Sequence, residues 1–238
     1  MDACDQRTRL ISTSSVQYAD GFRADLDILG RFCSRENILF CVDAIQSLGA
    51  IPFDVQRCQA DFVMADGHKW MLGPEGLALF YTRKEIREQL QLNQFGWRMV
   101  AMPNDFDRPD WRPSETGTRF ECGTPNMLGI HALNASLSLI EQEGIENISD
   151  RILRNTDYLI GLIDQQPALQ LLSDRRKSRL SGIVTFRVEG VEQEAIYHEL
   201  MNSRVICACR GGGIRFSPHF YTRESKLDAA IEKLLELI

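Results

Sequence analysis

The chain has 238 residues, a formal net charge of -6 and 44% hydrophobic residues, all ordinary values for a globular protein. A net negative charge argues against nucleic acid or an anionic membrane as a partner, because both attract basic surfaces. No apolar run approaches the roughly 20 residues of a membrane span, and the first residues lack the basic-then-apolar pattern of a signal peptide, so we expect neither.

The cysteines favour a reduced, cytoplasmic protein. Their number is odd and the chain is long enough to fold without disulfides. Cys207 and Cys209 are the only close pair, and no further ligands stand near them at metal-site spacing, so we predict no metal there and two partly buried thiols.

The first half of the chain alternates between strands and a helix. Residues 9–14 are predicted to form a strand, and residues 25–34 a helix with its apolar residues on one face. Short continuous apolar runs at 38–42, 61–65 and 77–81 are typical of buried strands in a parallel sheet. This order predicts an α/β fold with a mostly parallel sheet.

The second half begins after residues 96–125, a stretch rich in Pro, Gly, Asp and Trp without periodicity. A loop of this length is usually functional or disordered. The later predicted elements are helices over 128–144, 148–163 and 224–237 and strands over 182–188, 205–209 and 214–217. We expect residues 1–127 to belong to an α/β large domain and residues 128–238 to form an α+β C-terminal domain.

Polar residues follow two of the predicted parallel strands. Asp43 and Gln46 come after the first, and Asp66 to Lys69 after the second, where open α/β sheets bind ligands. Each feature also has an ordinary interpretation. Asp43 can be a helix N-cap, the Gly-His-Lys run can be a surface turn, and Arg119 and Glu121 can form a solvated ion pair.

Four segments together resemble the class V aminotransferase and cysteine desulfurase family. They are Val-Asp-Ala-Ile-Gln-Ser-Leu-Gly at 42–49, Gly-His-Lys-Trp-Met-Leu-Gly-Pro-Glu-Gly at 67–76, Arg-Phe-Glu-Cys-Gly-Thr-Pro-Asn at 119–126 and Ile-Arg-Phe-Ser-Pro-His-Phe-Tyr at 214–221. The resemblance covers nearly the whole chain. It implies fold type I of the pyridoxal-phosphate (PLP) dependent transferases, PLP as cofactor, an amino-acid substrate and a homodimer.

The resemblance also implies residues that hold the cofactor. Asp43 would face the pyridine nitrogen of PLP and keep it protonated. Gln46 would hydrogen-bond the phenolic oxygen of the ring, and His68 would lie by the phosphate. Thr124 would reach the phosphate of the neighbouring subunit.

Two further residues are implied to act on substrate. Lys69 would be the catalytic residue, bound to PLP as a Schiff base and able to move the proton on the α-carbon. Arg215 would bind the substrate α-carboxylate as a bidentate pair. Tyr18 follows the end of a strand. It can either face the substrate or pack in the protein interior, and the sequence leaves both interpretations open.

The chain departs from the cysteine desulfurase pattern at two positions. The reactive cysteine of desulfurases lies on a mobile loop, but here Arg210 runs through three glycines directly into Arg215, and Cys209 precedes that turn. We therefore expect transamination or elimination in preference to persulfide formation. Asp66 stands where many relatives have serine, so it either turns away from the phosphate or is bridged to it by a cation or water.

The resemblance begins in the middle of the cofactor domain. Family members have further strands that bring a phosphate-binding turn and a ring stacked on PLP. We therefore expect a chain that lacks this N-terminal part. The rival hypothesis is a non-catalytic or truncated remnant that keeps the fold but binds PLP poorly.

Overall fold

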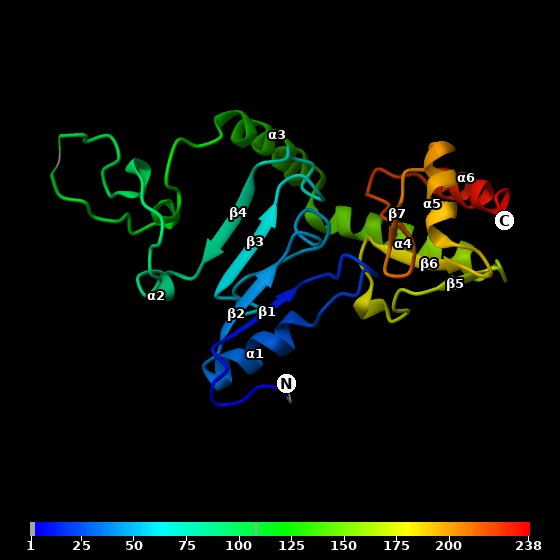
Figure 1. The fold of residues 1–238 in the computed structure, drawn as a ribbon, viewed down its shortest axis with the longest axis horizontal. Coiled ribbons are helices and arrows are strands. Elements are labelled where there is room, and N and C mark those ends of the chain that lie inside the picture. The colour runs from blue at the N-terminus through cyan, green and yellow to red at the C-terminus, as the bar shows by residue number, and fades with distance from the viewer. Residues whose placement is uncertain (1–2, 108) are drawn as a thin grey trace.

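The computed structural model describes residues 3–107 and 109–238 (Figure 1). A first sheet has the strand order β1-β2-β3-β4, and a second sheet has the order β5-β6-β8-β7. The strands are β1 (Leu10–Ser14), β2 (Leu39–Asp43), β3 (Phe62–Asp66), β4 (Ala78–Thr82), β5 (Leu169–Leu171), β6 (Val184–Val188), β7 (Ala208–Arg210) and β8 (Gly213–Phe216).

The helices lie around these two sheets. They are α1 (Leu26–Glu36), α2 (Lys84–Arg87), α3 (Met127–Glu143), α4 (Ile145–Asp164), α5 (Gln193–Asn202) and α6 (Glu224–Leu235), with short 3-10 turns η1 (Trp97–Met99), η2 (Gly117–Phe120) and η3 (Lys177–Arg179). None of the helices in the described ranges is both long enough and apolar enough to cross a membrane.

The first sheet is parallel except at one edge. β1, β2 and β3 run in the same direction, as predicted, whereas β4 pairs antiparallel to β3. The prediction of β4 as a third buried parallel strand was therefore wrong, and residues 78–81 are exposed. A parallel neighbour needs a crossover of a dozen or more residues, usually with a helix, and the short connection between β3 and β4 holds only turns.

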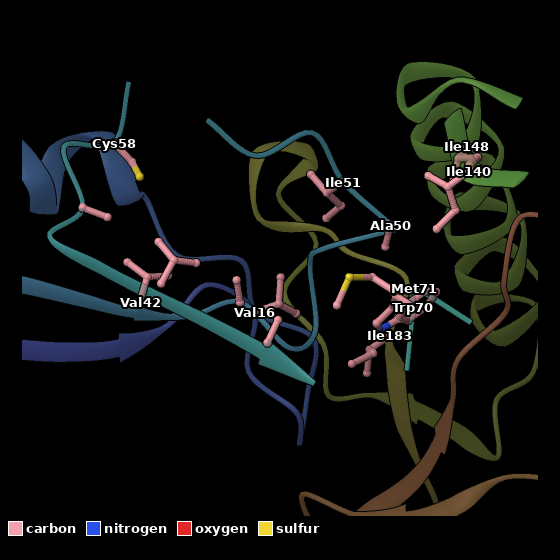
Figure 2. Close-up of a cluster of buried hydrophobic side chains, with 14 of the residues drawn as sticks. Val16, Val42, Ala50, Ile51, Cys58, Trp70, Met71, Ile140, Ile148 and Ile183 are labelled. Atoms are coloured by element: carbon pink, nitrogen blue, oxygen red, sulfur yellow. The ribbon is translucent and has the colours of Figure 1, made fainter. Parts of the chain in front are cut away.

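One face of the first sheet is buried and the other is open. Phe40 and Val42 of β2 and Val63 and Ala65 of β3 are at most 4% exposed. They belong to a core that also contains residues of α1, α3 and the loops between them. Figure 2 labels Val42 with other members of this core, among them Met71 and Ile140. On the opposite face Met64 is exposed, so strands that read as buried on both sides from their sequence are covered on one side only.

Two hydrophobic cores divide the interior, and α4 contributes to both. Ile148 and Ile152 near its beginning belong to the core under the first sheet. Leu159 and Ile163 belong to the core under the second sheet, and all four side chains are fully buried. The helix α3 packs in the first core. The division of the chain at residues 127 and 128 stays a proposal.

The loop after β1 ties the two sheets together. Four consecutive carbonyls, those of residues 18–21, accept hydrogen bonds from the side chains of Arg215 at 2.6 Å, Thr185 at 2.7 Å, Ser173 at 2.6 Å and Ser181 at 2.8 Å. We call this set of contacts the carbonyl clamp. Residue 21 has φ of 76° and a Cβ there would lie 2.3 Å from the Ile183 carbonyl oxygen, so only glycine fits.

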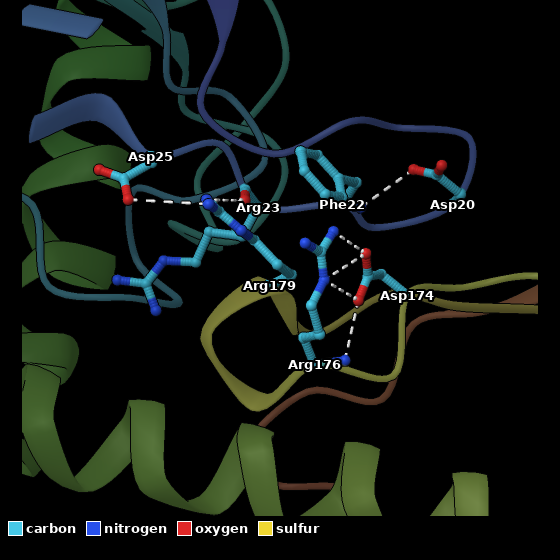
Figure 3. Close-up of polar contacts among 7 residues, drawn as sticks. All are labelled: Asp20, Phe22, Arg23, Asp25, Asp174, Arg176 and Arg179. Atoms are coloured by element: carbon cyan, nitrogen blue, oxygen red, sulfur yellow. Dashed lines mark hydrogen bonds and ion pairs between the residues drawn. The ribbon is translucent and has the colours of Figure 1, made fainter. Parts of the chain in front are cut away.

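Ion pairs and ring contacts extend the same interface beyond the clamp (Figure 3). The Arg179 guanidinium lies 3.7 Å from the Asp25 carboxylate and donates to the carbonyl of Arg23. The guanidinium groups of Arg176 and Arg179 also lie over the ring of Phe22, at 6.0 and 5.6 Å from its centre. Residues 18–25 are therefore tied by several contacts to the part of the chain that carries the second sheet.

Candidate active site

Two of the predicted site segments meet at the carboxyl ends of β2 and β3. Asp43 is the last residue of β2 and pairs with Met64 of β3 in the sheet register. The Nε1 of Trp70 donates to Oε1 of Gln46 at 2.9 Å in the interior. Because the carboxyl ends of parallel strands lie at one edge, residues 43–46 and 67–70 become neighbours in space.

Lys69 sits in a compact, strained turn. The N–H of Leu72 donates to the carbonyl of Lys69 at 3.0 Å, and the N–H of Gly73 donates to the carbonyl of Gly67 at 2.8 Å. Leu72 has φ of 60°, a left-handed conformation that costs a leucine about 1–3 kcal/mol. Such strain survives only where the surroundings fix the backbone, which favours a positioned lysine over an ordinary surface turn.

A cavity of about 440 Å³ opens between the two parts of the chain. Its lining comes from the loop after β1, the turns after β2 and β3, and the β7–β8 hairpin with the segment that follows it. The lining residues are Tyr18, Gln46, Lys69, Trp70, Arg210, Arg215, Ser217, His219 and Tyr221. This volume is typical of small-molecule sites. The cavity brings together Gln46, Lys69 and Arg215, three residues far apart in the sequence.

Arg215 reaches the cavity from β8. Its Nη1 donates to the Tyr18 carbonyl, whereas its Nε is buried and has no hydrogen-bond partner. Burial, followed by the nearby charge of Arg210, lowers the pKa of Arg215. An arginine still remains charged at neutral pH, so the unpartnered N–H calls for an acceptor. A carboxylate is the anion that a guanidinium binds best.

The other predicted cofactor residues lie outside the cavity lining. Asp43 is half-buried and its Oδ1 accepts the N–H of Ile45 at 3.0 Å, but residues 45–50 form turns and no helix, so its ordinary interpretation as a helix N-cap is wrong. His68 is half-buried beside Lys69, and Asp66 is exposed at the end of β3. Thr124 is exposed in the loop before α3. The structure of this chain does not bring these side chains to the cavity.

The ordinary interpretation of Arg119 and Glu121 as an ion pair is wrong. Glu121 pairs with Arg98 at 3.2 Å. Arg119 is only 8% exposed and its Nε has no hydrogen-bond partner. Its guanidinium lies over the ring of Phe120, 6.0 Å from the centre.

The thiols near the hairpin face away from the cavity. Cys209 pairs in register with Ile214, whose side chain is fully buried, so both point to the side of the sheet opposite Arg215. Cys207 and Cys209 are half-buried, as predicted. Burial raises the pKa of Cys207 to about 11, and burial with a hydrogen bond to Glu194 raises the pKa of Cys209. A protonated, enclosed thiol is a poor nucleophile.

Five cavity residues were not predicted from the sequence. Trp70 directly follows Lys69, Arg210 begins the hairpin turn, and Ser217, His219 and Tyr221 lie in the segment that contains Arg215. Their only signal was adjacency to residues already singled out. Tyr18, for which two interpretations were open, is 57% exposed and lines the cavity instead of packing in a core.

Comparison with known proteins identifies the family. The model of the aminotransferase class-V family matches residues 1–226. The chain belongs to the class-V aminotransferase family. Its relatives include an uncharacterised aminotransferase, YcbU, from Bacillus subtilis, which is 30% identical over 95% of this chain and 59% of its own length. A probable cysteine desulfurase from Methanothermobacter thermautotrophicus is 26% identical over 99% of this chain and 62% of its own length.

Solved structures of class-V proteins have the same fold. The apo structure of a cysteine desulfurase from Thermococcus onnurineus gives a TM-score of 0.88 with 24% identity, over 97% of this chain and 60% of that one. The complex of the cystine C-S lyase C-DES with its product cysteine persulfide gives 0.89 with 25% identity, over 98% and 62%. The predicted fold type I architecture is thereby confirmed. The chain spans about 60% of the length of the class-V proteins it matches.

Proposed function

We propose that this chain carries the lysine, the amide and the carboxylate-binding arginine of a PLP-dependent site that acts on an amino acid. The observation that carries the proposal is the single cavity lined by Gln46, Lys69 and Arg215. These are the groups that such chemistry needs: a primary amine, a donor for a ring oxygen, and a cation for a carboxylate.

The polar groups of the cavity fit PLP and its substrate. The Oε1 of Gln46 is already occupied by the Trp70 N–H, so its amide N–H groups are left to donate to an acceptor such as the phenolic oxygen of PLP. Arg215 uses its Nη1 on the Tyr18 carbonyl, so the N–H groups of its Nη2, which is not among the buried atoms, are likewise left to a carboxylate. Both free groups are donors, and both acceptors that we assign to them are oxygen anions.

Each residue has a separate task in the proposed reaction. The amine of Lys69 attaches the cofactor and afterwards gives and takes the proton at the α-carbon of the substrate. Bound PLP supplies an electron sink for the charge left at that carbon. Arg215 holds the α-carboxylate and so orients the α-carbon toward Lys69. On the family resemblance, and not on the cavity lining, we further assign Asp43 to the pyridine nitrogen, His68 to the phosphate, and Thr124 to the phosphate held by the other subunit of a dimer.

The hairpin geometry favours transamination or elimination in preference to persulfide formation. Gly211 and Gly212 have φ of 60° and 79° and form a two-residue turn between the paired residues Arg210 and Gly213. Such a turn leaves no mobile loop on which a cysteine can approach a substrate. The relatives that are named cysteine desulfurases therefore share the fold and family with this chain, and we do not assign their reaction to it.

Cofactor attachment is tested by reduction with borohydride after PLP is added, followed by peptide mapping. We expect the label on Lys69, and no specific label in Lys69→Ala. Lys69→Arg also stays unlabelled, because arginine remains protonated. The matched control is Lys84→Ala, which removes an exposed lysine and leaves the Lys69 label intact. A label spread over the surface lysines, with Lys69 unmodified, favours the remnant that binds PLP poorly and sinks the proposal.

A further inference from the structure

The cavity contains a second arginine, placed there by the register of the hairpin. Ala208 of β7 lies opposite Arg215 of β8, and Arg210 is two residues further along β7. Residues two apart on a strand share a face, so Arg210 and Arg215 project from the same side of the second sheet. Diagonal neighbours of this kind lie about 7–8 Å apart at their backbones, within reach of long side chains.

The two guanidinium groups share the cavity without a carboxylate. Arg210 donates one hydrogen bond to the carbonyl of Cys209, and Arg215 donates one to the carbonyl of Tyr18. In the described part of the chain, neither arginine forms an ion pair, and the cavity lining contains Lys69 but no aspartate or glutamate. Like charges in one cavity repel each other, and the charge of Arg210 contributes to the lowered pKa of Arg215.

One carboxylate at Arg215 leaves the charge of Arg210 uncompensated. A ligand with a second anionic group compensates both charges and is favoured over one with an apolar end, because it removes repulsion as well as adding attraction. The ordinary interpretation of Arg210 is an exposed, solvated arginine. That interpretation does not account for its position in the lining of the cavity that holds Arg215 and Lys69.

We propose that Arg210 is a specificity-determining residue and that the cavity takes amino acids with a second anionic group, with one carboxylate at Arg215 and the other anion at Arg210. This substrate class rests on the proposed function at Lys69. The anion site itself exists whether or not a cofactor binds, so it can be tested alone.

The test is calorimetric titration of the full chain with succinate and with butyrate, which have the same carbon chain and two or one carboxylates. Because Arg210 is exposed, we expect succinate to bind about 5-fold more tightly than butyrate. Arg210→Gln should bring the two affinities together, and Arg210→Lys should keep part of the difference since the positive charge remains. Arg215→Gln should weaken both ligands.

A matched control is Arg154→Gln, which removes one positive charge from an exposed position of α4 and should leave the ratio unchanged. Equal affinities in the unmodified chain, a ratio that survives Arg210→Gln, or no binding of either compound overturns the proposal. The result is independent of the labelling of Lys69. A Lys69 label with equal affinities removes only this inference, and a preference for succinate without the label removes only the proposed function.

Discussion

At the scale of single residues, His219 connects the main parts of the cavity. It is 8% exposed, and its ring lies 5.0 Å from that of Trp70 and 4.8 Å from that of Tyr221. Its Nδ1 accepts the N–H of Phe220 at 2.9 Å, so the proton of the neutral ring is on Nε2, 3.2 Å from the Trp70 carbonyl oxygen. His219 therefore holds Trp70, which in turn orients the amide of Gln46, and acts as a positioning residue.

The environment of His219 predicts how stability depends on pH. Burial lowers the pKa of His219 below its ordinary value of 6.5, so the unfolded chain takes up this proton first as the pH falls. Neutral His219 contributes fully to the free energy of unfolding when the pH is above its ordinary pKa of 6.5, and this contribution is lost as the pH falls below that pKa. We expect urea unfolding between about pH 8 and about pH 5 to give a free energy of unfolding that falls on the acid side.

His219→Asn should reduce the fall of the free energy of unfolding at acid pH. His131→Asn, at an exposed position of α3, should leave that fall unchanged. An acid slope in His219→Asn equal to that of the unmodified chain would show that other groups cause it.

At the scale of elements, the carbonyl clamp determines how the second sheet meets the first. The side chains that donate to residues 18–21 come from β6, β8 and the segments before β6. The four carbonyls that accept these hydrogen bonds lie in a loop and not in a strand of either sheet. The contact at the Gly21 carbonyl is buried and those at Ala19 and Asp20 are partly buried, so these three donors offset the desolvation cost of their carbonyls, whereas the contact between Tyr18 and Arg215 is exposed. The clamp thereby fixes Tyr18 and Arg215 on the two sides of one cavity.

Removal of one donor from the clamp should weaken the contact between the sheets. Thr185 is fully buried, and Thr185→Val keeps its shape but leaves the Ala19 carbonyl without that hydrogen bond. We expect the free energy of unfolding in urea to fall by about 1–3 kcal/mol. The same change at Thr13 of β1, whose hydroxyl makes only a 3.4 Å contact with the next carbonyl, should cost less than about 0.5 kcal/mol. Equal effects at both positions would mean that the clamp adds no stability.

At the scale of the whole molecule, residues 96–107 and 109–116 extend beyond the β4 edge of the first sheet (Figure 1), and η2 returns to β4, where the rings of Phe120 and Phe80 lie 5.6 Å apart. The 96–125 loop carries exposed aromatic residues, among them Trp97 at 44% and Phe106 at 79%, whose rings lie 6.3 Å apart. Exposed apolar groups gathered in one place are typical of protein interfaces. The same loop leads to Thr124, to which we assign a role in the site of a second subunit. Both features favour a homodimer formed through this loop.

Sedimentation tests this assignment. We expect the unmodified chain to sediment as a dimer, and a Trp97→Ser, Phe106→Ser double variant to shift toward monomer by about 10-fold or more in dissociation constant, because buried aromatic residues dominate interface energies. Ile206→Ser, which removes an 87% exposed side chain before β7, is the control and should leave the dimer intact. A monomer at high concentration, with PLP bound, would contradict the dimer.

The sequence by itself determined the alternation of strands and helices, because apolar periodicity and continuous apolar runs are local properties of the chain. It also placed Gln46 and Lys69 together, since each follows a parallel strand and such strands end at one edge. The three-residue β5 and the short α5 were missed, because so few buried positions give little periodicity. Only the tertiary structure decided the direction of β4, which depends on the length of its connection. It alone brought Arg215 and Arg210 from the second sheet against the loop of Tyr18, because contacts between segments so far apart depend on how the two cores pack.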